Sequence, residues 1–177
     1  MAFEPDIAAA TTAQDYQSFA ALVREYVDWC SERYADELGF MKQVFGHQAI
    51  ESELRAPESS YGPPFGRILL ARADGEAIGC IAYRRIGSAI CEMKRLYVRK
   101  TVHGRGTGRR LCQALLDAAR LDGYALVRLD TASRLAEAIA LYRSLGFHAC
   151  RPYNHYPPEL AVHIVYMELP LVGCLSE

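Results

Sequence analysis

The sequence predicts an α/β fold in which a mixed, mostly antiparallel twisted sheet carries helices on both faces. Three observations lead to this class. Apolar residues recur at helical spacing before residue 60, and short apolar runs of strand length follow a loop at residues 61–66. A strand, a helix and a second strand then succeed one another between residues 90 and 129, which implies a right-handed crossover and one parallel strand pair.

The first part of the chain is expected to form two helices. Gln14–Arg33 carries apolar side chains at helical spacing, and Met41–Leu54 offers a second, weaker pattern. The stretch Tyr61–Gly66 is the densest in proline and glycine, so it predicts a loop between two parts of one domain.

Three consecutive antiparallel strands are expected after this loop. The apolar runs Arg67–Ala73 and Glu76–Arg85 are joined by Asp74-Gly75, a dipeptide that favours a tight hairpin because glycine tolerates a positive φ. A third run, Ile90–Val98, follows across Gly87-Ser88.

The remaining elements alternate between helix and strand. Two helices are predicted to end just before Gly123 and Gly146. The expected elements are a helix at Arg105–Leu121, a strand at Ala125–Leu129, a helix at Leu135–Leu145, and strands at Phe147–Tyr153 and Val162–Leu169 that flank the loop Asn154–Pro158.

Length and composition indicate one soluble domain over residues 1–177. The chain is 51% apolar, which excludes a disordered protein, and its longest apolar runs are far too short to cross a membrane. The start MAFEPD lacks the basic region of a signal peptide, so a cytoplasmic protein is expected. No metal site is expected, because neither the histidines nor the cysteines show ligand spacing. We interpret the cysteines as buried, reduced thiols: Cys30, Cys80, Cys91, Cys112, Cys150 and Cys174.

The charge distribution points to a small polyanion. The net charge is −1, but residues 94–110 hold seven basic residues and no acidic one, which leaves a net −8 for the rest. A local basic patch on an acidic protein favours a small anionic ligand over nucleic acid, and neither nucleic acid nor a membrane is expected as a partner. A solvated basic face is the alternative.

A glycine-rich loop, His103–Gly108, separates an expected strand from an expected helix. Such a loop is an anion site, because unpaired amide groups and the helix dipole meet at a helix N-terminus. The dinucleotide pattern fails because Arg109 stands where the third glycine belongs, and the P-loop pattern fails because the chain has no Gly-Lys pair.

Three segments together resemble the GNAT superfamily of acetyl-CoA-dependent N-acetyltransferases. They are CEMKRLYVRKTVHGRGTGRRL, RLDT and AIALYRSLGF, and the resemblance is strongest from Cys91 to Phe147. The family's loop pattern is Gln/Arg-x-x-Gly-x-Gly/Ala. His103, Gly106 and Gly108 take its three places, and His103 departs from it.

The resemblance implies that acetyl-CoA binds where one strand splays from its parallel neighbour. The strand's main chain would bind the pantetheine arm, and the loop amides would bind the pyrophosphate. The histidine departure is expected to tune affinity. The expected contacts are Leu96, Tyr97, Val98, His103, Gly104, Arg105, Gly106, Thr107, Gly108 and Arg109, with Ser133 as a secondary contact and an expected helix N-cap.

Two catalytic residues are expected. The resemblance assigns Tyr142 as the acid that protonates the departing thiolate, and an aromatic packed in the core is the alternative. Glu92 is the candidate base, directly or through water, because strand alternation places it on one face with Lys94 and Leu96. An ion pair of Glu92 with Lys94 or Arg84 is the alternative.

The resemblance therefore implies transfer of acetyl from acetyl-CoA to a primary amine of a small molecule. Residues 25–58 hold eight acidic against three basic residues in the region that covers the acceptor cleft in similar proteins, which favours a cationic amine. Transfer to a protein or peptide, through an open groove at residues 154–158, and a CoA-binding sensor without turnover are the alternatives. A homodimer is left open.

Overall fold

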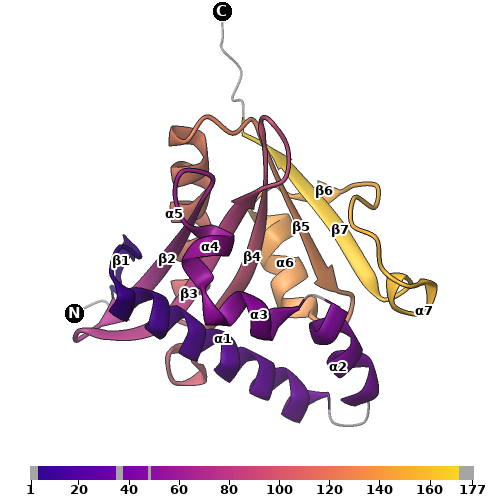
Figure 1. Ribbon diagram of the computed structural model, residues 1–177, viewed down its shortest axis with the longest axis horizontal. Helices are drawn as coiled ribbons and strands as arrows, with labels where there is room; N and C mark the ends of the chain where they lie inside the picture. The colour runs from indigo at the N-terminus through magenta and orange to yellow at the C-terminus, as the bar shows by residue number, and fades with distance from the viewer. Residues whose placement is uncertain (1–3, 35–37, 48, 172–177) are drawn as a thin grey trace, which may run out of the picture.

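The computed structural model describes residues 4–34, 38–47 and 49–171. Their strands form one seven-stranded sheet with the order β1-β2-β3-β4-β5-β7-β6 (Figure 1). The strands are β1 (Asp6–Ala9), β2 (Gly66–Ala73), β3 (Glu76–Arg85), β4 (Ile90–Val98), β5 (Leu126–Ala132), β6 (His148–Ala149) and β7 (Ile164–Pro170). The helices are α1 (Ala13–Arg33), α2 (Leu38–His47), α3 (Ile50–Arg55), α4 (Pro57–Tyr61), α5 (Thr107–Leu121), α6 (Ala136–Ser144) and α7 (Pro158–Ala161).

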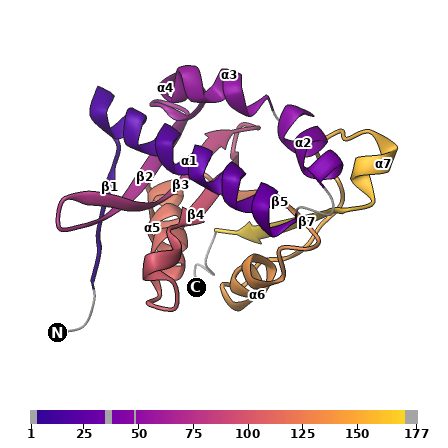
Figure 2. The ribbon, with the colours of Figure 1, turned by 90° about the horizontal axis from the view of Figure 1, so that it is seen from below.

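The fold class is confirmed. The strands β2, β3 and β4 form the expected antiparallel meander, and α5 crosses from β4 to β5, which pair in parallel. Every other strand pair in the described sheet is antiparallel. Seen from below, α1, α3 and α4 cover one face of the sheet, whereas α5 and α6 cover the other (Figure 2).

Strand alternation divides the core between these two faces. Leu69 and Ile81 pack with α5 in one cluster of buried side chains, and their neighbours Ile68 and Cys80 pack with α1 in the other. The central strands are therefore apolar on both faces, which is typical of strands buried between two helical layers.

Several expected boundaries are wrong. The predicted helix Met41–Leu54 is broken into α2 and α3, because Ala49 has a left-handed backbone with a φ of 51° that cannot continue a helix. Of the predicted strand Phe147–Tyr153, only His148 and Ala149, which form β6, pair with β7. Gly106, with a φ of 79°, delays the start of α5 to Thr107. The elements β1, α4 and α7 were not predicted.

The cysteines of the described chain are free thiols. Cys30, Cys80, Cys91 and Cys112 are buried and Cys150 is partly buried, whereas Cys174 lies outside the described residues. Burial raises the pKa of the Cys112 thiol to about 12, so it stays protonated at neutral pH. Over the described residues, no helix combines the length and apolar character that crossing a membrane requires.

A β-bulge in β4 changes which way its side chains point. Lys94 pairs with Ala82 and Tyr97 with Cys80, so the register slips by one residue around Arg95, whose φ is 61°. Leu96 therefore packs on the α5 side, whereas Lys94 and Tyr97 face α1. The expectation that Leu96 shares a face with Glu92 and Lys94 is wrong because the bulge interrupts the alternation.

A buried ion pair holds this bulge. The guanidinium of Arg95 donates to both carboxylate oxygens of Glu53 on α3, from Nε at 2.8 Å and from Nη2 at 2.9 Å. The side chains are 4% and 6% exposed. Removal of one partner would leave the other charge buried without compensation.

We predict that Glu53→Ala lowers the free energy of unfolding by about 3 kcal/mol, because it strands the Arg95 guanidinium in the core. Urea unfolding followed by circular dichroism measures the change. Glu51→Ala, an exposed position on the same helix, is the matched control and should cost far less. Equal losses for the two variants would contradict the structural role of the pair.

Candidate active site

A cavity of about 480 Å³ lies between β4 and β5. The two strands pair at only three positions, the last being Glu92 with Arg128, and they then diverge (Figure 1). Met93–Val98 of β4 forms one wall and Leu129–Ala132 of β5 the other, while side chains of α1, α2 and α6 cover the space. An extended ligand could therefore lie alongside β4 where a neighbouring strand is missing.

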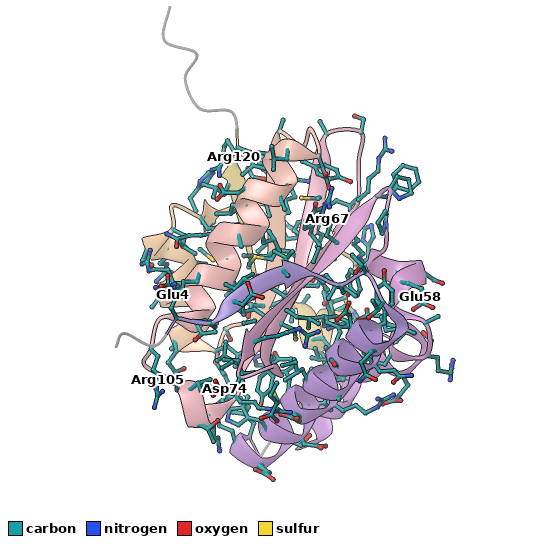
Figure 3. The ribbon with its side chains drawn as sticks, turned by 90° about the vertical axis from the view of Figure 1, so that its left-hand side faces the viewer. Glu4, Glu58, Arg67, Asp74, Arg105 and Arg120 are labelled. Atoms are coloured by element: carbon teal, nitrogen blue, oxygen red, sulfur yellow. The ribbon has the colours of Figure 1, made fainter. Side chains whose placement is uncertain are left out.

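The glycine loop forms one end of the cavity. Gly104 and Gly106 have φ values of 74° and 79°, and a Cβ placed at either position would meet no atom within 4 Å. No side chain caps α5, so the amides of its first turn have no partner within the helix and remain available to an anion. Arg105 and Arg120 lie near opposite ends of α5 (Figure 3), which places Arg105 at the dipole's positive end.

Two side chains of the loop bear directly on ligand binding. His103 lines the cavity, and its Nε2 donates to the carbonyl of Val98 at 2.7 Å. Thr107 is 1% exposed and lines the cavity, yet its Oγ1 has no hydrogen-bond partner among the described residues. A buried hydroxyl without a partner is costly, so this hydroxyl at a helix N-terminus is a candidate contact for an anionic ligand.

Tyr142 of α6 lines the cavity and is 7% exposed. Its ring packs on Phe147, with the centroids 5.9 Å apart, so the expected core contact and the expected place in the site are both present. Burial raises the pKa of the Tyr142 hydroxyl well above its usual range, and Cys112 and Asp130 add to the shift. This hydroxyl is therefore protonated at neutral pH.

Glu92 is fully buried, and its carboxylate is already occupied. Arg84 donates to its Oε2 from Nε at 2.9 Å, and Asn154 and Tyr153 donate to its Oε1 at 2.7 and 3.2 Å. Lys94 lies 3.6 Å away. Glu92 thus forms the ion pair that was the alternative to a base, and Lys94, not Glu92, lines the cavity.

A second carboxylate, Asp130 at the end of β5, lies beside this network. Lys94 donates to its Oδ1 at 3.0 Å, and Asn154 and Tyr156 donate to its Oδ2 at 2.8 and 2.9 Å. Burial alone would raise the pKa of Asp130, but the Lys94 charge and these hydrogen bonds outweigh it, so the pKa falls below its usual 3.8. Asn154 therefore bridges two carboxylates and ties the irregular segment after β6 to β4 and β5.

From the sequence, no site role was assigned to Lys94, Asn154 or Tyr156. The position of Asp130 at a parallel strand end was an available signal. Ser133, in contrast, is exposed, and the N-cap of α6 is Leu135, so the expected capping role is wrong.

The part of the cavity next to α1 and α2 is aromatic. From the acid-rich segment of residues 25–58, the cavity lining comprises Tyr26, Trp29, Arg33, Val44 and Phe45. None of these described lining residues is acidic, so the expected acidic lining is absent from the described part of the segment, whereas Asp36 and Glu37 lie outside the described residues. Asp28 and Glu51 lie on exposed helix faces instead, and Glu53 is buried against Arg95.

The comparisons with known proteins agree with this geometry. The model of the acetyltransferase (GNAT) family matches residues 29–147. The chain belongs to the GNAT acetyltransferase family. An uncharacterised N-acetyltransferase of Schizosaccharomyces pombe is 36% identical over 167 residues, which are 93% of this chain and 94% of that protein. The family match begins at residue 29, well before the motifs that carry the resemblance in the sequence.

Solved GNAT structures share the fold. A crystal structure described as an acyl-CoA N-acyltransferase of Klebsiella pneumoniae is 27% identical, with a TM-score of 0.70 over 95% of this chain and 98% of that one. An acetyltransferase of Salmonella typhimurium, solved with its cofactor acetyl-CoA, is 18% identical, with a TM-score of 0.62 over 99% of this chain and 98% of that one.

This GNAT protein is therefore an acyltransferase, and the alternative of a sensor without turnover is set aside. Over the described parts of the chain, no cluster of histidine, cysteine or carboxylate side chains could hold a metal ion.

We predict that Asp130→Asn destabilises the fold at neutral pH by about 3 kcal/mol, because Lys94 loses its close ion-pair partner in a buried position. Since the folded pKa of Asp130 is lowered, its contribution is present above the ordinary 3.8 and is lost as pH falls through the folded value. Unfolding curves between acid and neutral pH should therefore converge for the two proteins.

The matched control is Tyr156→Phe, which removes one hydrogen bond from Asp130 and should cost about 1 kcal/mol. A deficit of Asp130→Asn that stayed constant down to the lowest pH would contradict the ion-pair contribution.

Proposed function

We propose that this enzyme transfers the acetyl group of acetyl-CoA directly to a primary amine of a small molecule. Transfer forms a C–N bond and breaks the C–S bond, while the amine loses one proton and the departing sulfur gains one. The observation that carries the proposal is a glycine loop with a buried, unpartnered hydroxyl at one end of a cavity between diverging strands.

The residues of the loop and of β4 suit acetyl-CoA, which supplies the activated acetyl group. The amides from Gly104 to Arg109 and the hydroxyl of Thr107 would hold the diphosphate. The main chain of Leu96, Tyr97 and Val98 would hold the pantetheine arm, because no strand pairs with that edge of β4 in the described sheet. The acetyl-CoA in the Salmonella typhimurium structure supports the same cofactor here.

Tyr142 is proposed as the general acid. No described residue hydrogen-bonds its hydroxyl, which is protonated at neutral pH and therefore has a proton to give to the departing sulfur. Tyr142 lines the same cavity as Leu96 and Val98, which supports this role.

Glu92 is proposed to act through its neighbours and not by touching the acceptor. Its side chain is fully buried behind Lys94 and Asp130, which do line the cavity. Through Lys94 and Asn154 it fixes the position of Asp130, so in this proposal it is a positioning residue.

A small acceptor is favoured over a polypeptide because elements around one part of the cavity are bridged on two sides. This part lies next to α1 and α2, and we call it the acceptor end. Arg33 of α1 pairs with Glu137 of α6 at 2.6 Å, and the hydroxyl of Tyr34 donates to the carbonyl of Arg134 at 3.2 Å. The helix α2 lies against α7 (Figure 2). Transfer to a peptide would need an open groove at residues 154–158, where Asn154 and Tyr156 are bound to Asp130.

We predict that Thr107→Val weakens CoA binding about tenfold, because a hydrogen bond to a charged group contributes about 1.5 kcal/mol or more. The same change should leave stability unchanged or raise it, since the hydroxyl has no partner among the described residues. Isothermal titration calorimetry and thermal unfolding measure the two effects.

Thr107→Ser keeps the hydroxyl and is the control, with CoA affinity close to that of the unaltered protein. If Thr107→Val bound CoA as tightly as the unaltered protein, the hydroxyl would not contact the diphosphate.

We predict that Tyr142→Phe lowers kcat about 100-fold, since it removes the proton donor, while the Kd for acetyl-CoA changes little. Thiol release with saturating amine measures kcat, and calorimetry measures Kd. Tyr124→Phe removes another largely buried tyrosine hydroxyl, which donates to the carbonyl of Phe65 outside the cavity, and should leave kcat unaltered. Equal rates for Tyr142→Phe and the unaltered protein would remove the acid role.

A further inference from the structure

Aromatic rings from three elements converge on the acceptor end of the cavity. The ring of Tyr26 on α1 lies 6.3 Å from Trp29, 5.9 Å from Phe45 on α2 and 5.9 Å from Tyr97 on β4, measured between centroids. All four rings line the cavity, and each is partly exposed. The exposed parts of these rings form an apolar wall that a ligand can cover.

The rings meet in two different geometries. Tyr26 and Trp29 are stacked at an interplanar angle of 24°, whereas Phe45 meets Tyr26 edge-on at 75°. Aromatic pairs gain about 0.5–1.5 kcal/mol beyond their buried area in stacked or edge-to-face contacts. The wall thus offers both kinds of contact to a further aromatic ring. A flexible aliphatic chain would gain only apolar contact from it.

The charges at this end are paired. Arg33 binds Glu137, Lys94 binds Asp130 and Arg95 binds Glu53. Each carboxylate that lines the described part of the cavity therefore has a basic partner, and a polycation would find no unpaired acidic group there. The electrostatics disfavour polyamines, which the acid-rich sequence of the helices had favoured.

The polar groups of this region lie at its β-sheet side. Lys94 and Asp130 are on adjacent strands, 5% and 2% exposed, just beyond the last β4–β5 pair, and the Tyr156 hydroxyl is bound to Asp130. A ligand with a polar head and an apolar body would therefore place its head at the diverging strands and its body toward α1 and α2.

We propose that the acceptor is a primary amine carried on an aromatic group, an arylalkylamine. Its ring contacts Tyr26, Trp29 and Phe45, and its amino group lies at the diverging strands beside Lys94 and Asp130. This inference rests on the proposed acetyl transfer at the same site and names the class of its acceptor.

Trp29 provides a direct test, because it is the single tryptophan of the chain and lines the acceptor end. The protein saturated with CoA is titrated with phenylethylamine, hexylamine and spermidine while tryptophan emission is recorded. We expect phenylethylamine to cause a saturable change in tryptophan emission. Its affinity should be about fivefold higher than that of hexylamine. Spermidine should bind more weakly still. Equal or tighter binding of hexylamine or spermidine would overturn the proposal.

Phe45→Leu separates ring contact from apolar contact, since it removes a ring and keeps an apolar side chain and the Trp29 reporter. It should weaken the binding of phenylethylamine about threefold and leave the affinity for hexylamine unchanged. Phe65→Leu, at a 55% exposed position outside the cavity, is the matched control and should change neither. An equal loss for both amines in Phe45→Leu would show that the rings act only as apolar surface, against the proposal.

Two further measurements separate this inference from the proposed function. Calorimetry with acetyl-CoA, in the absence of any amine, reports on the cofactor site alone. If acetyl-CoA binds and thiol is released with spermidine but not with phenylethylamine, the acceptor class is wrong and acetyl transfer stands. If acetyl-CoA does not bind, the proposed function itself fails, and this inference fails with it.

Discussion

The early end of the pairing between β4 and β5 is the constraint on which the site depends. The bulge at Arg95, held by the buried ion pair with Glu53, turns the strand just past the last paired residues. Beyond it, the main chain of Leu96 to Val98 borders a cavity where a continuous sheet would have another strand. Backbone groups are obligatory hydrogen-bonding partners, so this edge is suited to an extended ligand with amide groups of its own.

The cavity is divided by chemistry along its length. Main-chain amides and the Thr107 hydroxyl lie at the start of α5, Tyr142 of α6 lines the wall, and aromatic rings of α1 and α2 line the part next to those helices. Between them, the buried charges of Glu92, Lys94 and Asp130 offset one another together with Arg84. Burying such charges is costly, and the cost is offset only where every member of the network is bonded. Here the network also binds Asn154 and Tyr156, which holds their segment against β5.

The sequence predicted the elements whose signals are local. The hairpin at Asp74-Gly75 and the helix ends before Gly123 and Gly146 depend on residues next to one another in the chain, and all three are present. The helix Met41–Leu54 was wrong because nothing in its apolar spacing marks the left-handed backbone of Ala49. The strand predicted at 147–153 pairs with β7 at two positions only, and Pro152 has no amide hydrogen with which to continue the ladder.

By itself the sequence determined the glycine loop between a strand and a helix, the crossover that makes β4 and β5 parallel, and the tyrosine that follows on α6. These are contiguous patterns whose geometry is set by neighbouring residues. The tertiary structure alone decided that Glu92 is bound by Arg84 and that Leu96 faces away from Lys94. It also decided that rings from positions 26, 45 and 97 form one wall. Strand register and the packing of helices on the sheet set the direction of these side chains, and neither is encoded within a single stretch of sequence.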